Sequence, residues 1–348
     1  MEKKSKEILF IDSLKIGYVS GKTENVLLPP LTASAASGEL IAVIGRNGIG
    51  KSTLLRTLTG LQKPLGGDIF YSGKNIRDFS RMELAQNVGY ISTEIVKVSN
   101  MRVYDLVALG RFPHTNWTGK IEMKDHEIIS DSLKMTSMES FAGKLVSELS
   151  DGERQKSMIA RILAQDTGIM IMDEPTAFLD VAGRYEVLHL MHILSANNDK
   201  TIIFSTHDLQ MAISQSDKIW LILENKLIEG APEDLMIAGA FDNLFDSSSV
   251  QFNSEDGTFS FRSDNKGSIF IEGGGNKRHW TEKALNRAGY TISKEKTFPF
   301  VVLPSDNSDL WQLTEKSAIR EFNSIYELIL YLSKDAAKAN KNISCNDL

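Results

Sequence analysis

A glycine-rich segment between residues 45 and 53 has the residue types that bind nucleotide phosphates. It reads GRNGIGKST, fits the pattern GxxxxGKS/T and directly follows a short apolar run. Its glycines permit a turn whose backbone N–H groups point at phosphate, and the helix that begins there adds positive potential. A plain glycine turn before a helix would need neither the lysine nor the serine. The predicted nucleotide ligands are Gly45, Asn47, Gly48, Gly50, Lys51, Ser52 and Thr53.

Within this loop, two side chains have distinct predicted roles. The Lys51 ammonium is expected at the terminal phosphates, and the Ser52 hydroxyl is a ligand for Mg²⁺.

Two adjacent carboxylates end another apolar run, Ile169–Met172. In a doubly wound sheet the carboxyl ends of the strands lie together, so this pair is expected beside the phosphate loop. We expect Asp173 to hold Mg²⁺ through water and Glu174 to polarise the attacking water. Taken alone, the pair also fits a strand that simply ends in solvated acids.

A third motif, LSDGERQ over residues 149–155, opens a strongly helical segment. Ser150 suits the N-cap and Glu153 the third helical position of a capping box, a role that needs no nucleotide. Ser150 and Gly152 at a helix N-terminus also offer free N–H donors and a dipole that favour a phosphate. On this motif alone, both interpretations stay open.

Short apolar runs and segments of helical spacing alternate around these motifs. The runs of strand length are residues 8–11, 40–44, 88–91, 169–172, 202–204 and 219–223, and helical spacing is clearest in 153–164 and 184–194. This alternation predicts a mostly parallel sheet covered on both faces. After the run at 88–91 the apolar residues fall at helical spacing, which predicts a helical insertion over about residues 80–145.

The composition excludes several classes of protein. The chain has 348 residues with 42% hydrophobic and 24% charged side chains, which is typical of a folded globular protein. A net charge of −6 gives no basic field, so we predict no nucleic-acid partner. Cys345 is the single cysteine, so no internal disulfide can form, and a reducing cytosol fits. The N-terminus does not resemble a signal peptide, and no apolar run approaches the roughly 20 residues of a membrane span, so work at a membrane would require docking.

Together, the motifs resemble those of the ATP-binding subunit of ABC transporters. GRNGIGKST is similar to Walker A, LSDGERQ to the signature LSGGQ, IMIMDEP to Walker B, AFLD to the D-loop and STHD to the switch-histidine motif, in the family's order over about residues 7–240. The resemblance implies an α/β fold with a P-loop NTPase core and a helical subdomain, ATPase activity, and ATP and Mg²⁺ as cofactors. It also implies a homodimer in which the signature of one subunit closes over ATP held by the other.

The resemblance assigns three further residues. Tyr18 matches the aromatic residue that stacks on adenine, Asp180 the D-loop residue at the dimer interface, and His207 the histidine at the γ-phosphate. Each also has an ordinary structural interpretation. These are a tyrosine packed on a sheet, a helix N-cap and a structural histidine at a strand end.

One position departs from the family pattern. After Val88–Ile91 the family usually has Pro-Gln, whose glutamine contacts Mg²⁺ and links the site to the membrane partner. Here Thr93 stands at the glutamine position and Glu94 follows, and either side chain could ligate a hard cation. We expect Glu94, or failing it Thr93, to take over the sensing of bound nucleotide.

Residues 100–114 and the glutamate in LSDGERQ resemble the branch that serves importers of ferric siderophores, haem and cobalamin. That resemblance implies a cytoplasmic subunit on the inner face of the membrane, bound to a polytopic permease and indirectly to an extracytoplasmic substrate-binding protein. The alternative is a soluble ABC ATPase that acts on nucleic acid or ribosomes. Such proteins usually have two cassettes or a long coiled coil, and neither is evident here.

A polar, turn-rich stretch near residue 245 predicts a boundary between an ATP-binding domain (1–245) and an accessory domain (246–348). Strands expected at 259–262, 268–272 and 298–303 and helices at 280–288 and 324–332 predict a small α+β domain, which resembles no family that we recognise. The loop GGGNKR at residues 273–278 suits either an anion at a helix N-terminus or a flexible turn with solvated charges. Regulation, dimer support and partner docking stay open as roles.

Overall fold

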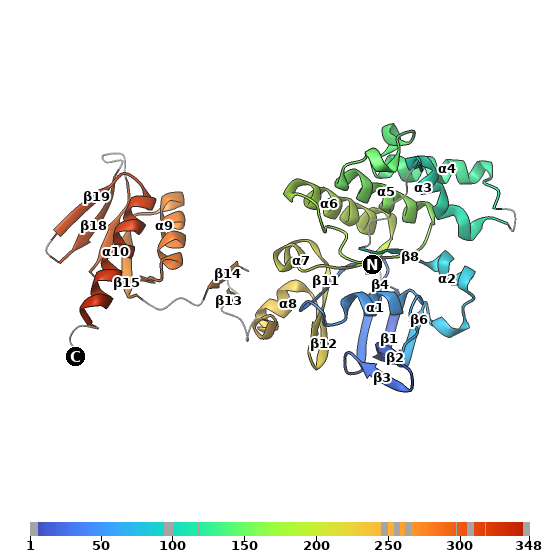
Figure 1. The fold of residues 1–348 in the computed structure, drawn as a ribbon, viewed down its shortest axis with the longest axis horizontal. Helices are drawn as coiled ribbons and strands as arrows, with labels where there is room; N and C mark the ends of the chain where they lie inside the picture. Colours follow the sequence, from blue (N-terminus) through green and yellow to red (C-terminus); the bar gives the residue numbers. More distant parts are fainter. Residues whose placement is uncertain are drawn as a thin grey trace, which may run out of the picture. The chain divides into compact units, whose positions relative to one another are not determined.

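The computed structural model describes residues 6–93, 100–116, 119–244, 250–253, 258–261, 266–296, 298–304, 310–316 and 318–343. The chain divides into two compact units, Met1–Leu244 and Phe245–Leu348 (Figure 1). Each unit has a hydrophobic cluster of its own.

A six-stranded sheet forms the centre of the first unit. Its order is β12-β11-β5-β10-β9-β8, and only β12 runs antiparallel to its neighbour. Nearly every residue of the inner strands is buried, which explains why their sequences are continuous apolar runs rather than alternating ones. The strands are β5 (Leu40–Gly45), β8 (Val88–Ile91), β9 (Ile169–Met172), β10 (Thr201–Ser205), β11 (Lys218–Leu223) and β12 (Lys226–Gly230).

A second, antiparallel sheet of order β4-β1-β6-β7 was not predicted from the sequence. The run at residues 8–11, expected in the parallel sheet, lies here as part of β1. Its Leu9 and Ile11 share one core cluster with Ile41 and Val43 of β5 and with α1 (Lys51–Leu58), so this sheet and α1 lie over the same face of the main sheet. Its outer residues are polar, so short alternating strands carried a weaker signal than the buried runs. The strands are β1 (Glu7–Lys15), β4 (Leu31–Ala36), β6 (Gly66–Tyr71) and β7 (Lys74–Asn75), with a separate hairpin of β2 (Gly17–Ser20) and β3 (Thr23–Val26).

The other face of the main sheet is covered by helices whose buried residues lie outside that cluster. Helices α6 (Val181–Asn198) and α7 (Leu209–Gln215) contact β5, and α5 (Asp151–Ala164) contacts β8. The remaining short helices are α2 (Arg81–Asn87), α8 (Pro232–Ile237) and the 3₁₀ turns η1 (Ile76–Asp78), η3 (Glu139–Phe141), η4 (Val146–Glu148) and η5 (Asp242–Leu244).

A helical group stands at one end of the unit, where α3 (Val103–Ala108), α4 (Met123–Met135) and α5 pack together (Figure 1). A buried ion pair of 2.8 Å joins Arg111, in the 3₁₀ helix η2 (Leu109–His114), to Asp125 of α4, and Arg111 also donates to the Ala164 carbonyl of α5. The group differs at both ends from the expected insertion over about residues 80–145. Strand β8 is hydrogen-bonded into the main sheet, and α5 packs with the helices before it.

The second unit contains a five-stranded sheet of order β16-β15-β17-β18-β19. Helices α9 and α10 contribute Leu285, Leu328 and Leu332 to one cluster with the strands, so both helices cover the same face. Helix α9 begins at Gly275, five residues before the expected start, and β16, β18 and β19 were not predicted. The elements are β13 (Val250–Asn253), β14 (Thr258–Phe261), β15 (Ser268–Glu272), α9 (Gly275–Arg287), β16 (Thr291–Ser293), β17 (Phe300–Val302), β18 (Trp311–Glu315), β19 (Ala318–Phe322) and α10 (Ile325–Ile343).

Candidate active site

The phosphate loop joins the carboxyl end of β5 to α1, and its shape depends on glycine. Gly48 and Gly50 have φ values of 78° and 113°, in the left-handed region that other L-residues rarely adopt. A Cβ atom at Gly45 would lie 2.8 Å from the Ile222 carbonyl oxygen, so a side chain there would clash with β11. The loop therefore keeps its backbone free to approach a ligand closely.

Lys51 is 7% exposed and its ammonium lies beneath this loop. Its Nζ donates to the Gly45 carbonyl at 2.8 Å and to the Arg46 carbonyl at 3.3 Å. Burial lowers the pKa of Lys51, and the nearby Glu174 and Asp173 carboxylates oppose that shift. The Lys51 ammonium is therefore bound by two backbone carbonyls, and phosphate oxygens could take their place.

The two carboxylates at the end of β9 are organised by Ser205, the last residue of β10. The Ser205 hydroxyl donates to Asp173 Oδ1 at 2.7 Å and accepts from the Glu174 N–H at 2.9 Å. Glu174 has φ of 48°, a strained value for a non-glycine residue, and strain of this kind gathers at functional sites. Ser205 was not singled out from the sequence, where a polar residue ending a buried strand just before Thr206-His207 was the available signal.

His207 lies beyond β10 and faces Glu174. Its Nδ1 is 3.7 Å from Glu174 Oε2, and its side chain is 59% exposed. The structure thus brings this histidine to the same carboxylate that is predicted to polarise water.

A cavity of about 570 Å³ opens between these groups, in the size range of small-ligand sites. Tyr18 borders it from β2, is 50% exposed, and its hydroxyl lies 2.8 Å from Thr53 Oγ1. An exposed aromatic face at a cavity rim can stack on a base. The lining is Tyr18, Leu27, Asn47, Gly48, Gly50, Lys51, Ser52, Thr53, Glu174 and His207.

Five predicted site residues do not line this cavity. Two of them directly neighbour its lining, because the Gly45 carbonyl accepts from Lys51 Nζ and Asp173 precedes Glu174, whereas Ser150, Gly152 and Asp180 do not. Ser150 caps α5, where its hydroxyl accepts from the Glu153 N–H at 3.3 Å and its own N–H donates to Glu153 Oε2 at 2.8 Å. Gly152 lies in the first turn of the same helix, and Asp180 caps α6 by accepting from the Gly183 N–H at 2.8 Å. In a single chain Ser150 and Asp180 act as helix caps, and contacts of all three of these residues with phosphate would require a second chain.

The oxygen donors in and beside the cavity fit Mg²⁺ only in part, since Ser52 lines it and Asp173 does not. Ser52 offers an exposed hydroxyl and Asp173 a buried carboxylate, both oxygen ligands of the kind that Mg²⁺ prefers. Across the described ranges, no group of three or more His, Cys, Asp or Glu side chains could hold a metal ion. A Mg²⁺ ion here would take most of its ligands from phosphate and water.

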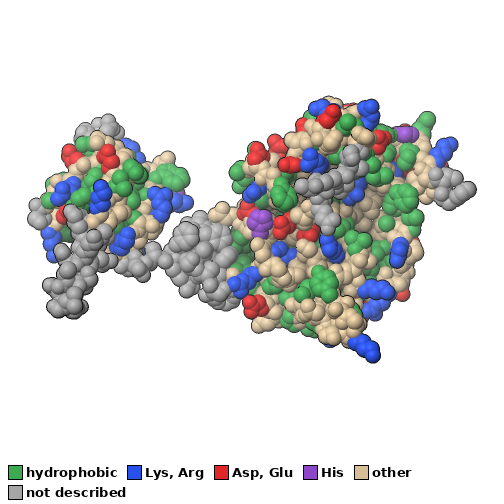
Figure 2. Space-filling view, in the orientation of Figure 1, with side chains coloured by type: hydrophobic (Ala, Val, Ile, Leu, Met, Phe, Trp, Pro, Cys, Tyr) green, Lys and Arg blue, Asp and Glu red, His purple; other side chains and the backbone are tan. Residues whose placement is uncertain are grey.

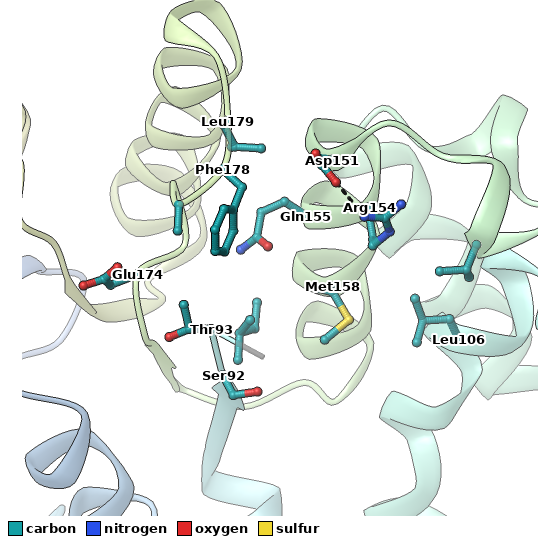
Figure 3. Close-up of a pocket in the computed structure, with 13 residues that line it drawn as sticks. Ser92, Thr93, Leu106, Asp151, Arg154, Gln155, Met158, Glu174, Phe178 and Leu179 are labelled. Carbon is teal, nitrogen blue, oxygen red and sulfur yellow. Dashed lines mark hydrogen bonds and ion pairs between the residues drawn. The ribbon is translucent and has the colours of Figure 1, made fainter. Parts of the chain in front are cut away.

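A second, smaller pocket lies beneath α5 and shares Glu174 with the first (Figure 3). Thr93 borders it, and its hydroxyl donates to the Asp173 carbonyl at 3.2 Å. The Thr93 side chain is therefore hydrogen-bonded to the backbone at the end of β9, at the residue predicted to hold Mg²⁺. Glu94, the other candidate to replace the family glutamine, lies outside the described residues.

In the second unit, the basic residues of the glycine-rich loop already have partners. Arg278 donates to the Ile271 and Gly273 carbonyls and to Glu282, and Lys277 donates to the Pro304 carbonyl. This pairing favours a structural role for the loop over an anion site.

The visible surface of each unit mixes acidic, basic and apolar side chains, with no broad field of one sign (Figure 2). None of the helices in the described ranges has the length and apolar character that crossing a bilayer requires.

Two family models match the chain. Residues 28–177 match the model described as ABC transporter, and residues 266–333 match the one described as iron ABC transporter C-terminal domain. The second match lies where the sequence pattern suggested no family, because strand and helix spacing alone carries no motif.

Several curated proteins are similar over most of their length. An ABC transporter ATP-binding protein of Methanocaldococcus jannaschii is 35% identical over 77% of this chain and 92% of its own. The petrobactin import ATP-binding protein of Bacillus anthracis is 34% identical over 64% and 82%, and the ferric enterobactin transport ATP-binding protein of Escherichia coli is 33% identical over 67% and 85%.

Solved structures have the same fold. A component of the ABC transporter complex cbiONQ from Clostridium perfringens is 28% identical, with a TM-score of 0.59 over 67% of this chain and 92% of that one. A dimeric bacterial ABC transporter cassette is 23% identical, with a TM-score of 0.57 over 65% and 99%. These likenesses confirm the expected α/β fold with a P-loop core.

Proposed function

This chain belongs to the ABC transporter ATP-binding proteins, which are ATPases, and from that premise we propose that it powers uptake of a metal chelate through a membrane permease. The cargo that we propose is a ferric siderophore, with haem or cobalamin as chemically related choices. Support comes from the iron-type C-terminal domain and from relatives whose names specify petrobactin and ferric enterobactin.

The observation that carries the catalytic part is the convergence of Lys51, Ser52, Glu174 and His207 on one cavity. In the proposed reaction, the loop N–H groups and Lys51 bind the β- and γ-phosphates, and Tyr18 stacks on adenine. Glu174 orients the attacking water and accepts its proton, while His207 contacts the γ-phosphate. Mg²⁺, when bound at Ser52 and Asp173, neutralises phosphate charge.

We propose a homodimer as the active unit. Ser150, Gly152 and Asp180 lie outside the cavity of their own chain, and a second chain placed head to tail would bring them to its phosphates. Mixing Lys51→Ala and Ser150→Arg chains should yield dimers with one intact site and therefore more activity than either variant alone. Mixed dimers that form without gaining activity would contradict this arrangement.

In this proposal the ATP-binding domain (1–245), with its helical subdomain, docks peripherally on the cytoplasmic face of the membrane. A polytopic permease binds it there, a substrate-binding protein acts outside, and residues 246–348 are accessory. The division of the chain after residue 244 and the extent of the C-terminal match support these bounds.

Uptake of ⁵⁵Fe-siderophore by cells that lack this chain tests the transport role. Wild-type protein should restore uptake and Glu174→Gln should not, although both copurify with a permease. Copurification with ribosomes or DNA only, and unchanged uptake, would favour a soluble ABC ATPase instead.

A further inference from the structure

The pocket beneath α5 contains a polar group that the proposed mechanism does not use. Gln155, on the second turn of α5, has a fully buried Nε2 with no hydrogen-bond partner. In Figure 3 its carboxamide points away from α5 toward the side of the pocket where Thr93, Phe178 and Glu174 lie. A buried N–H donor without a partner lowers the stability of the fold, so its position requires a structural or functional explanation.

The pocket is small but not filled. It encloses about 50 Å³, enough for a water molecule or for a modest inward shift of α5. Its walls come from the ends of β8 and β9, from residues 177–179 and from α5, and Leu106 and Val146 complete the lining. Because the space between α5 and the strand ends is not filled, α5 can move closer to the strands into a second packed position.

Thr93 is a suitable acceptor for the unpaired Nε2. Its hydroxyl uses its single proton on the Asp173 carbonyl, which leaves oxygen lone pairs free to accept. From Asp173 the contacts continue through the Ser205 hydroxyl to the Glu174 N–H. A bond from Gln155 to Thr93 would connect the signature helix, through Asp173 and Ser205, to the backbone N–H of Glu174, whose side chain is proposed to orient the water.

We propose that Gln155 is a positioning residue that donates to Thr93 Oγ1 when ATP draws α5 toward the strand ends, and thereby holds Glu174 in place for hydrolysis. The inference rests on the proposed role of Glu174. It assigns to Gln155 and Thr93 together a link that other family members are expected to make with the glutamine at the position of Thr93.

A double-mutant cycle on the purified full-length chain tests this link. Gln155→Leu should lower kcat by about threefold to tenfold, the usual worth of one hydrogen bond, while the equilibrium Kd for ATP stays unchanged. Thr93→Val should lower kcat at least as much, and the double variant should be no slower than Thr93→Val. Thr93→Ser, which keeps the hydroxyl, should recover turnover, and Gln215→Leu on α7 is the matched glutamine control.

Three results would overturn the proposal. These are an unchanged kcat in Gln155→Leu, effects that multiply in the double variant, or a Kd for ATP that weakens as much as kcat falls. Thermal unfolding of each variant separates loss of fold from loss of positioning. Glu174→Gln, measured alongside, reports on the proposed function separately, because full turnover by that variant would remove Glu174 from its role whatever Gln155 does.

Discussion

The two cavities of the first unit share Glu174 and differ in almost everything else. The cavity at the phosphate loop has about 570 Å³ and is lined mainly by the glycine backbone, Lys51 and hydroxyls, whereas the pocket under α5 has about 50 Å³ and mixes seven apolar with six polar or charged residues. In the first, Lys51 is already paired with carbonyls, while in the second Gln155 Nε2 is unpaired. From this contrast we infer that the large cavity holds the residues for ATP hydrolysis. The small pocket is where the proposed bond from Gln155 to Thr93 would form when nucleotide binds.

The sharpest test of the contrast is Glu174→Gln, at the residue that both cavities share. The amide cannot accept a proton from water, so hydrolysis should fall by roughly 10²- to 10⁴-fold. ATP affinity should persist, because Glu174 lines the cavity without joining the phosphate loop. Steady-state phosphate release and equilibrium binding measure the two effects, with exposed Glu233→Gln as the control.

Lys51→Met separates binding from turnover in the large cavity. Loss of the ammonium should weaken ATP binding by about 100-fold, since the charge faces the terminal phosphates. The stability of the empty chain should hardly change, because burial already disfavours the charged form and its loss removes that desolvation cost. Calorimetric titration and thermal unfolding report the two quantities, and a large drop in thermal stability with intact binding would contradict this account.

Ser205→Ala tests the connection between the two cavities. The change removes the hydroxyl that joins Asp173 to Glu174, so kcat should fall by roughly tenfold. Affinity for ATP without Mg²⁺ should be unaffected, because Ser205 does not line the nucleotide cavity. A wild-type kcat at saturating Mg²⁺ and ATP would show that Glu174 needs no such support.

The smallest expected effect is at the rim of the large cavity. Tyr18→Ala should weaken ATP binding by about fivefold, the order of one stacking contact. Tyr18→Phe keeps the ring, loses only the contact with Thr53, and should bind within about twofold of wild type. Equal weakening by both variants would assign the effect to the hydroxyl and not to stacking.

Sequence reasoning was most direct where the predicted function requires one residue type at one place. Gly48, Lys51 and the Asp173–Glu174 pair could be read because a phosphate-binding turn and a strand-end carboxylate pair tolerate few alternatives. The buried strands of the main sheet were also predicted, since parallel strands covered on both faces are uniformly apolar.

What could not be predicted depends on contacts between distant parts of the chain. Ser205 is an ordinary serine in the sequence, and only the pairing of β9 with β10 brings it to Asp173 and Glu174. Gln155 lies in a recognised motif, but its lack of a partner is a property of packing. The other strands of the antiparallel sheet (β4, β6 and β7) and strands β16, β18 and β19 of the second unit had sequence patterns too weak to distinguish from turns.

A structure of the Glu174→Gln chain with ATP and Mg²⁺ tests the central claim most directly. We predict a dimer with two ATP molecules, each held between Lys51 of one chain and Ser150 and Gly152 of the other. Each Gln155 Nε2 should lie within hydrogen-bond distance of Thr93 Oγ1 in its own chain. A monomer with ATP bound away from Lys51, or a dimer whose signature helices do not contact the nucleotide, would contradict the account.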